Sequence, residues 1–158
     1  MTVQNTKINW FGEIKKDENK LPQALDYFMK KYEEFLPKLA IGGSLSREEA
    51  ELPYLNSICQ EDWATLDAIM EHYNIKLRAA RSKYYKKYLE TYARQLSSND
   101  VKNYVEGEQE IVAFQAIINE INLVKNKFVG LSKGLESKNW QLSNITKIKS
   151  LGLDLVEI

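Results

Sequence analysis

Apolar residues recur at steps of three and four along most of the chain, which is the spacing of one face of a helix. The clearest run extends from Cys59 to Tyr84, and no Gly or Pro lies between Pro53 and Gly107. A sustained alternation of three and four is typical of a coiled-coil seam or of a long helical hairpin. The residues of this seam are, in order, Cys59, Trp63, Leu66, Met70, Tyr73, Leu77, Ala80 and Tyr84.

The same spacing returns from Ile111 to Leu135, which predicts a second long helix able to pair with the first. Pro, Gly and polar clusters mark where the other elements begin and end. We expect an N-terminal extension over 1–20 and one helical domain over 21–158. The expected elements of that domain are a short helix over 21–36, a long helix over 46–96 kinked near Pro53, a turn and short helix over 97–107, a second long helix over 108–138 and a C-terminal helix over 141–151.

No segment shows the alternation of a strand, so the pattern predicts an all-α fold. The predicted form is an elongated, coiled-coil-like hairpin of long helices that oligomerises, with short N- and C-terminal helices. A helix over 54–96 would be roughly 64 Å long, whereas a compact domain of this size has a radius of gyration of about 15 Å. The helix must therefore bend back near Asn74 or Ser82, or be covered by other subunits. The candidate subunit contacts are Leu66, Met70, Tyr73, Leu77, Phe114, Ile118, Ile121 and Phe128.

Charge is unevenly distributed, although the 22 basic residues of the chain balance 22 acidic ones. The segment from Leu45 to Glu71 has seven acidic residues and one basic residue, and the segment from Lys76 to Arg94 has seven basic residues and one acidic residue. Any attraction to a polyanion must therefore arise locally. The acidic block over 48–71 either keeps nucleic acid away from one face or docks a basic partner.

Four tyrosines lie among the basic residues of the second segment. Guanidinium groups grip phosphates in a fork, and aromatic rings stack on bases for about 1–3 kcal/mol per base. This combination favours binding of single-stranded nucleic acid with little sequence preference. The alternative is that the tyrosines pack under a neighbouring helix while the lysines are solvated. The candidate DNA contacts are Arg78, Arg81, Lys83, Tyr85, Lys86, Lys87, Tyr88 and Tyr92.

Residues for catalysis are scarce. His72 is the single histidine and has no Glu or Cys at ligand spacing, and Cys59 is the single cysteine. We therefore expect no enzyme, no metal and no cofactor. No stretch approaches the roughly 20 apolar residues of a membrane span, and the polar start of the chain lacks the apolar stretch of a secretion signal. We expect a cytoplasmic protein without membrane contact.

Two strings carry a resemblance to a known family. LRAARSKYY, from Leu77 to Tyr85, is followed by a polar turn, a long apolar-periodic helix and WQLSNI, from Trp140 to Ile145. Over about 67–152 the chain resembles the UvsY recombination mediators of T-even-like phages. The resemblance implies an all-helical protein that assembles into rings, binds single-stranded DNA and helps a RecA-like recombinase replace the single-stranded-DNA-binding protein. It also implies that the protein is located in the cytoplasm of an infected bacterial host.

The match to the DNA-binding residues of that family is partial. The family places a Lys and an Arg, separated by one residue, just ahead of the tyrosines. Arg81 matches the Arg, but Ala79 stands at the Lys position. Arg78 points about 100° away from Ala79 on a helix, so it does not simply replace the missing Lys.

Two other classes of function remain open on the sequence. One is a non-enzymatic helical oligomeric assembly protein or virion adaptor without DNA binding. The other is a small regulator that binds an enzyme through its acidic helix.

Overall fold

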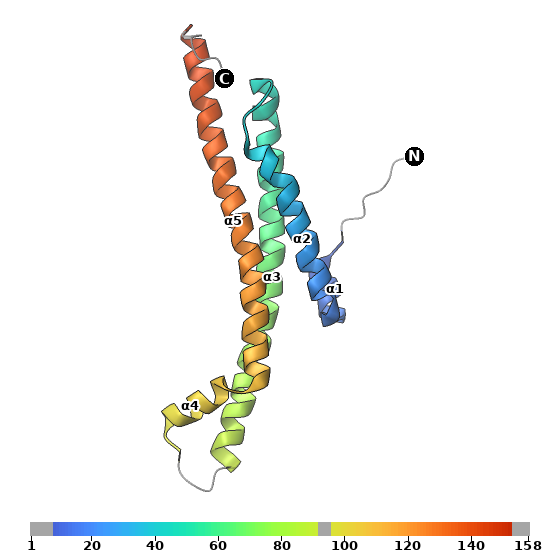
Figure 1. Cartoon of the computed structure of the whole chain (residues 1–158), viewed down its shortest axis with the longest axis vertical. Coiled ribbons are helices and arrows are strands. Elements are labelled where there is room, and N and C mark those ends of the chain that lie inside the picture. The colour runs from blue at the N-terminus through green and yellow to red at the C-terminus, as the bar shows by residue number, and fades with distance from the viewer. Residues whose placement is uncertain (1–7, 92–95, 153–158) are drawn as a thin grey trace, which may run out of the picture. The chain divides into compact units, whose positions relative to one another are not determined.

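Every regular element that the computed structural model describes, over residues 8–91 and 96–152, is a helix (Figure 1). The predicted all-α class is therefore confirmed for these residues. Within them, no helix combines the length and the apolar content that a membrane span requires. The elements are α1 (Trp10–Lys16), η1 (Glu18–Lys20), α2 (Leu21–Phe35), η2 (Leu36–Leu39), α3 (Leu45–Thr91), α4 (Ser98–Glu106) and α5 (Gln109–Ser150), where η denotes a 3₁₀ helix.

Helix α3 corresponds to the predicted long helix and is continuous. It includes Pro53, so the proline does not start a new helix. It also includes Asn74 and Ser82, so the chain does not bend back at either residue. The predicted end at Leu96 is wrong, because Leu96 is not helical. Residues 92–95 lie outside the described part of the chain.

The predicted break between a second long helix and a C-terminal helix is also wrong, because α5 runs through it. No Gly or Pro lies between Leu135 and Leu142. Leu135, Lys138 and Leu142 are all buried, and their spacing of three and four keeps them on one helix face. A polar stretch on the other face does not interrupt the helix, since its backbone bonds are made within the helix itself.

The described chain forms two compact units where the sequence analysis expects one domain. Unit 1 comprises the residues up to Thr65 and those from Val124 onward, and unit 2 comprises Leu66–Leu123. Helices α3 and α5 each contribute a segment to both units. Each unit adds short helices of its own, α1 and α2 in unit 1 and α4 in unit 2, and therefore has its own core.

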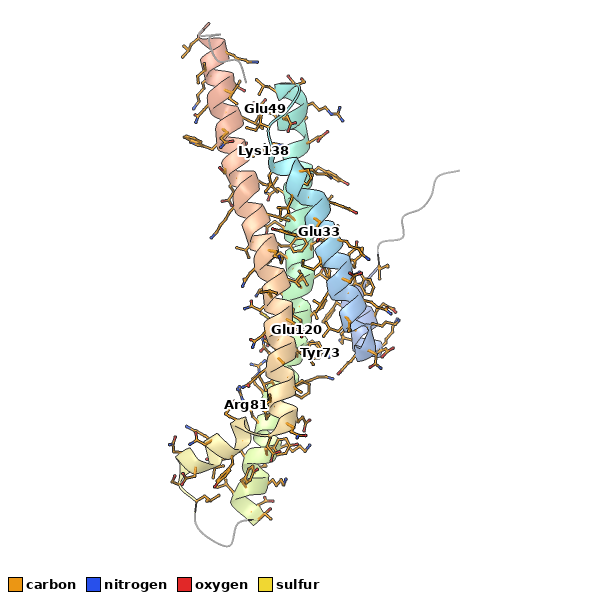
Figure 2. All side chains as sticks on the ribbon, viewed as in Figure 1. Glu33, Glu49, Tyr73, Arg81, Glu120 and Lys138 are labelled. Atoms are coloured by element: carbon orange, nitrogen blue, oxygen red, sulfur yellow. The ribbon has the colours of Figure 1, made fainter. Side chains whose placement is uncertain are left out.

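In unit 1, α2 and the second half of α5 pack on the first half of α3 (Figure 1). Phe128 of α5 is fully buried, and its ring meets the Phe28 ring edge-on at 6.1 Å. Two buried charges are paired across helices: Asp62 with Lys31, and Lys138 with Glu48. Lys138 is labelled on α5 in Figure 2. Glu48 and Asp62 belong to the acidic block, so at least part of that block serves internal pairing.

The N-terminal extension is folded from Trp10 onward. Asn9 caps α1 by accepting a hydrogen bond from the Gly12 amide at 3.0 Å. Ile14 is fully buried, and the Trp10 ring lies 5.6 Å from the Tyr27 ring of α2. Helix α1 is thus part of unit 1.

In unit 2, α4 and the start of α5 pack on the last part of α3. Ser97 and Asp100 form a capping box that fixes the start of α4. One buried core cluster of this unit consists of Leu77, Ala80, Val101, Val105 and Ile111.

Candidate nucleic-acid interface

The basic segment of α3 lies in unit 2, and its cations differ in exposure. Lys83, Lys86 and Lys87 are exposed, whereas Arg81 is partly buried. Tyr84, Tyr85 and Tyr88 are also partly buried and pack against the core of unit 2. The structure therefore combines both interpretations of the tyrosines: their rings support the core, but they are not sealed inside it. Tyr92 lies outside the described residues.

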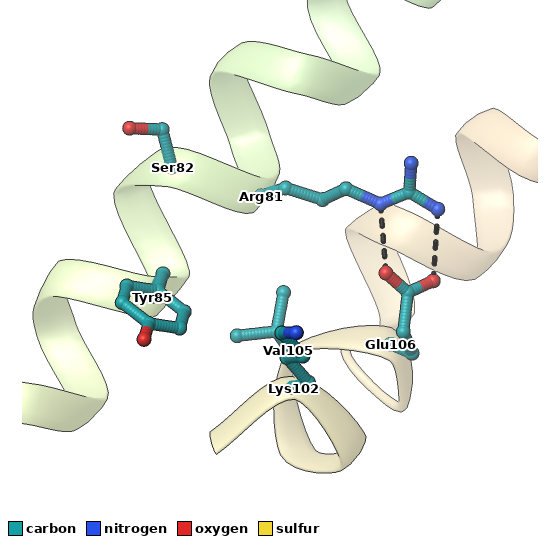
Figure 3. Close-up of a pocket in the computed structure, with 6 residues that line it drawn as sticks. All are labelled: Arg81, Ser82, Tyr85, Lys102, Val105 and Glu106. Carbon is teal, nitrogen blue, oxygen red and sulfur yellow. Dashed lines mark hydrogen bonds and ion pairs between the residues drawn. The ribbon is translucent and has the colours of Figure 1, made fainter. Parts of the chain in front are cut away.

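Arg81 is held by a carboxylate from the end of α4. Its Nη2 donates to Oε2 of Glu106 at 2.9 Å, and its Nε lies 2.8 Å from Oε1 (Figure 3). One hydrogen bond and one ion-pair contact thus place both carboxylate oxygens against the side of the guanidinium that can bind a carboxylate or a phosphate. Hydrogen bonding to Arg81 lowers the pKa of Glu106, so this carboxylate stays charged at neutral pH.

Glu110, in the first turn of α5, binds two groups of the basic segment. The hydroxyl of Tyr84 donates to Oε2 of Glu110 at 2.8 Å, and the Lys83 ammonium donates to the same oxygen at 3.2 Å. The hydrogen bond from Tyr84 is the main cause that lowers the pKa of Glu110, and Glu110 in turn raises the pKa of Lys83. Tyr88 donates similarly to Oε1 of Glu108 at 2.6 Å.

Glu106, Glu108 and Glu110 therefore form one set of carboxylates, which we call the acidic collar. They alternate along the junction of α4 and α5 and together bind Arg81, Lys83, Tyr84 and Tyr88. The collar residues are absent from the sequence-based candidates, although the string EGEQE over 106–110 is their signal. Arg78 is also paired, with Glu71 of its own helix at 2.5 Å.

A hollow of about 520 Å³ opens beside the Arg81 and Glu106 pair. The Tyr85 ring and Val105 form apolar parts of its wall, and Lys102 of α4 supplies a second cation (Figure 3). Lys102 is absent from the sequence-based candidates, because it lies outside the basic segment. The remaining lining residues are Ser82, Arg81 and Glu106.

Three exposed lysines of unit 2, Lys86, Lys87 and Lys102, form no ion pair with a described carboxylate. The Lys87 ammonium lies 5.5 Å from the centre of the Tyr84 ring and 5.8 Å from that of Tyr88. The Tyr88 ring is in turn stacked on Tyr104 at 5.6 Å. Cations and rings thus alternate on one partly exposed surface.

The candidate subunit contacts are mostly internal. Leu66, Tyr73, Leu77, Ile121 and Phe128 are buried within the single chain, while Met70, Phe114 and Ile118 are partly exposed. Contacts between subunits through the buried five would require the helices to separate. Oligomerisation through this seam therefore stays a prediction.

The described residues can also be assessed for metal binding and for the reactivity of the Cys59 thiol. In the described part of the chain, no group of three His, Cys, Asp or Glu side chains is arranged to hold a metal ion. Cys59 is fully buried, and its thiol donates to the Phe128 carbonyl at 3.4 Å. Burial raises the pKa of this thiol to about 11, with a further contribution from Asp62, so it is protonated at neutral pH.

Comparisons with protein-family models, with curated proteins and with solved structures find no match for this chain.

Proposed function

We propose that unit 2 binds a single nucleic-acid strand with little sequence preference, and that the chain acts as a recombination mediator. The observation that carries the binding proposal is the hollow where Tyr85 lies beside Arg81 and Lys102. Lys86 and Lys87 extend the cationic surface along the same helix as Tyr85. Phosphates need such cations, and a base needs an apolar ring on which to stack.

The chemistry of the surface favours a flexible strand over a duplex. Lys86, Lys87 and Lys102 are exposed ammonium groups that bind phosphates as point charges and carry no sequence information. A base stacked on Tyr85 must first be unpaired, which a single strand provides without cost. Binding should weaken as salt rises, because each phosphate contact releases a counterion.

The mediator role follows from strand binding together with the resemblance to the UvsY recombination mediators. The chain would hold DNA coated by single-stranded-DNA-binding protein in an open path and assist loading of a RecA-like recombinase. Self-association would place several such surfaces on one strand and raise the effective concentration of each. The direct measurement is recombinase ATPase activity on coated single-stranded DNA, which the chain should stimulate without hydrolysing ATP itself.

Replacing Lys86, Lys87 and Lys102 together by Gln is expected to weaken binding of an oligothymidine roughly 100-fold, because each charged interaction with a phosphate contributes about 1 kcal/mol or more. Fluorescence polarisation between about 50 and 200 mM salt measures the affinity and its salt dependence. The logarithmic salt slope should become shallower by about 0.7 for each phosphate that the variant no longer binds.

The matched control replaces Lys133, Lys147 and Lys149, three exposed lysines of α5 in unit 1, by Gln. This variant has the same net charge as the first and should bind almost as well as the unmodified chain. Equal weakening in the two variants would mean that net charge alone, and not the unit 2 surface, causes binding. Absence of binding at low salt would refute the proposal outright.

A second candidate, a helical assembly protein without DNA binding, is favoured by one observation. Four groups of the basic segment, Arg81, Lys83, Tyr84 and Tyr88, already have partners within the chain. In this alternative the collar serves only to fasten α4 and α5 to α3. The polarisation experiment separates the two candidates, because an assembly protein retains no DNA at low salt.

A further inference from the structure

The acidic collar occupies the groups that a bound strand would use. Glu106 fills the guanidinium fork of Arg81, and Glu110 binds Lys83. Glu108 holds the hydroxyl of Tyr88, which is a candidate for stacking on a base. Each collar residue thus binds at least one member of the basic and aromatic segment.

A carboxylate resembles a phosphate in what it offers these groups. Both present two oxygens to the guanidinium fork, and both accept charge-assisted hydrogen bonds from ammonium groups. The collar therefore stands where phosphate oxygens of a strand would stand. A phosphate that reaches Arg81 must first displace Glu106, and the displaced carboxylate then repels it.

Arg81 and Lys83 can nevertheless exchange their collar carboxylates for another anion. The side chains of Arg81 and Glu106 are 40% and 45% exposed, and that of Lys83 is 66% exposed. Ion pairs that are this exposed are weak and open readily to water and to other anions.

We propose that the acidic collar makes binding depend on strand length, so that unit 2 rejects mononucleotides and free phosphate and accepts only strands with several phosphates. The inference rests on the proposed function and adds the class of ligand that the same site selects.

The physical reason is the order in which contacts form. Lys86, Lys87 and Lys102 have no ion pair with a described residue, so they bind phosphates without displacing a described carboxylate. A strand anchored on them brings its next phosphate to Arg81 at high effective concentration, which offsets the displacement of Glu106. A single nucleotide has no such anchor.

The test compares oligothymidines of about 4, 8 and 16 nucleotides, which cover the range of site sizes of single-strand-binding OB folds, with one of about 24 nucleotides that exceeds it. Thymidine monophosphate and inorganic phosphate are the competitors. The variants are Glu106→Gln, Glu110→Gln and both together. Glu120→Gln is the matched control, since Glu120 is an exposed carboxylate in unit 2 outside the collar. Thermal unfolding by circular dichroism verifies that each variant is folded.

Each single collar variant should bind the shorter oligomers about two- to fivefold more tightly than the control, as expected when one competing exposed pair is removed. The double variant should gain about tenfold, and the shortest oligomer that binds should become shorter. The gain should diminish for the longest oligomers, whose many contacts already displace the collar.

The experiment distinguishes failure of this inference from failure of the proposed function. If the unmodified chain binds long oligothymidines and the folded collar variants match Glu120→Gln or bind more weakly, the inference is overturned and the proposed function survives. If neither the unmodified chain nor the double variant binds an oligomer of any length at low salt, both are overturned.

Discussion

Replacing Lys138 by alanine is expected to lower the free energy of unfolding by about 3–5 kcal/mol. Lys138 is only 4% exposed, and its ammonium donates to the Lys38 carbonyl of η2 at 2.7 Å and pairs with Glu48 of α3. The substitution removes a cation that joins three elements of unit 1 and leaves a carboxylate without its partner. Urea unfolding followed by circular dichroism measures the decrease.

The double variant Lys138→Met with Glu48→Leu is the control, because replacing both charges by apolar side chains removes the unpaired carboxylate. It should recover most of the stability that Lys138→Ala removes. If the double variant is as unstable as Lys138→Ala, the lysine acts mainly through the Lys38 carbonyl and the ion pair contributes little.

The stabilisation that the Lys138 and Glu48 pair contributes decreases at acidic pH. The hydrogen bond from Lys138 lowers the pKa of Glu48 below its ordinary value of 4.5. The stabilisation is therefore complete above pH 4.5 and is lost as the pH falls through the lower, folded pKa. The difference between the unmodified chain and Lys138→Ala should shrink over that acidic range.

Phe128→Ala is expected to cost about 3–5 kcal/mol, because it opens a cavity at a fully buried position of unit 1. The Phe128 ring meets the rings of Phe28 and Tyr32 edge-on, at 6.1 and 6.4 Å between centroids, and the substitution removes both of these aromatic interactions as well. The midpoint and slope of the urea transition measure the cost.

Tyr54→Ala is the matched control, since Tyr54 is an aromatic residue of unit 1 that is 67% exposed. Its substitution should change the stability by no more than about 0.5 kcal/mol. If Phe128→Ala lowers the stability no more than Tyr54→Ala does, the Phe128 site collapses without leaving a cavity.

The sequence is sufficient to predict the all-α class and the buried face of the long helix, though not every helix end, because the signals of a helix are local. The steps of three and four from Cys59 to Tyr84 place the buried face of α3, with Leu66, Tyr73 and Leu77 in the core. The same signal does not tell whether a seam pairs within one chain or between chains. That distinction depends on which other helix covers it, and here segments of the same chain do so.

The candidate site was only partly predictable for a different physical reason. The charge of the basic segment is visible in the sequence, but its partners are not, since Glu106 lies 25 residues beyond Arg81. Only the packing of α4 and the start of α5 on α3 brings the collar to these cations. Lys102 joins the hollow through the same packing.

The reactivity of the buried Cys59 thiol reports transient opening of unit 1. Alkylating reagents attack the thiolate, and this group is both 0% exposed and protonated at neutral pH. Modification by iodoacetamide must therefore await a transient separation of α3 from α5 in unit 1. The labelling kinetics of the unmodified chain, without any introduced probe, consequently measure how often unit 1 opens locally.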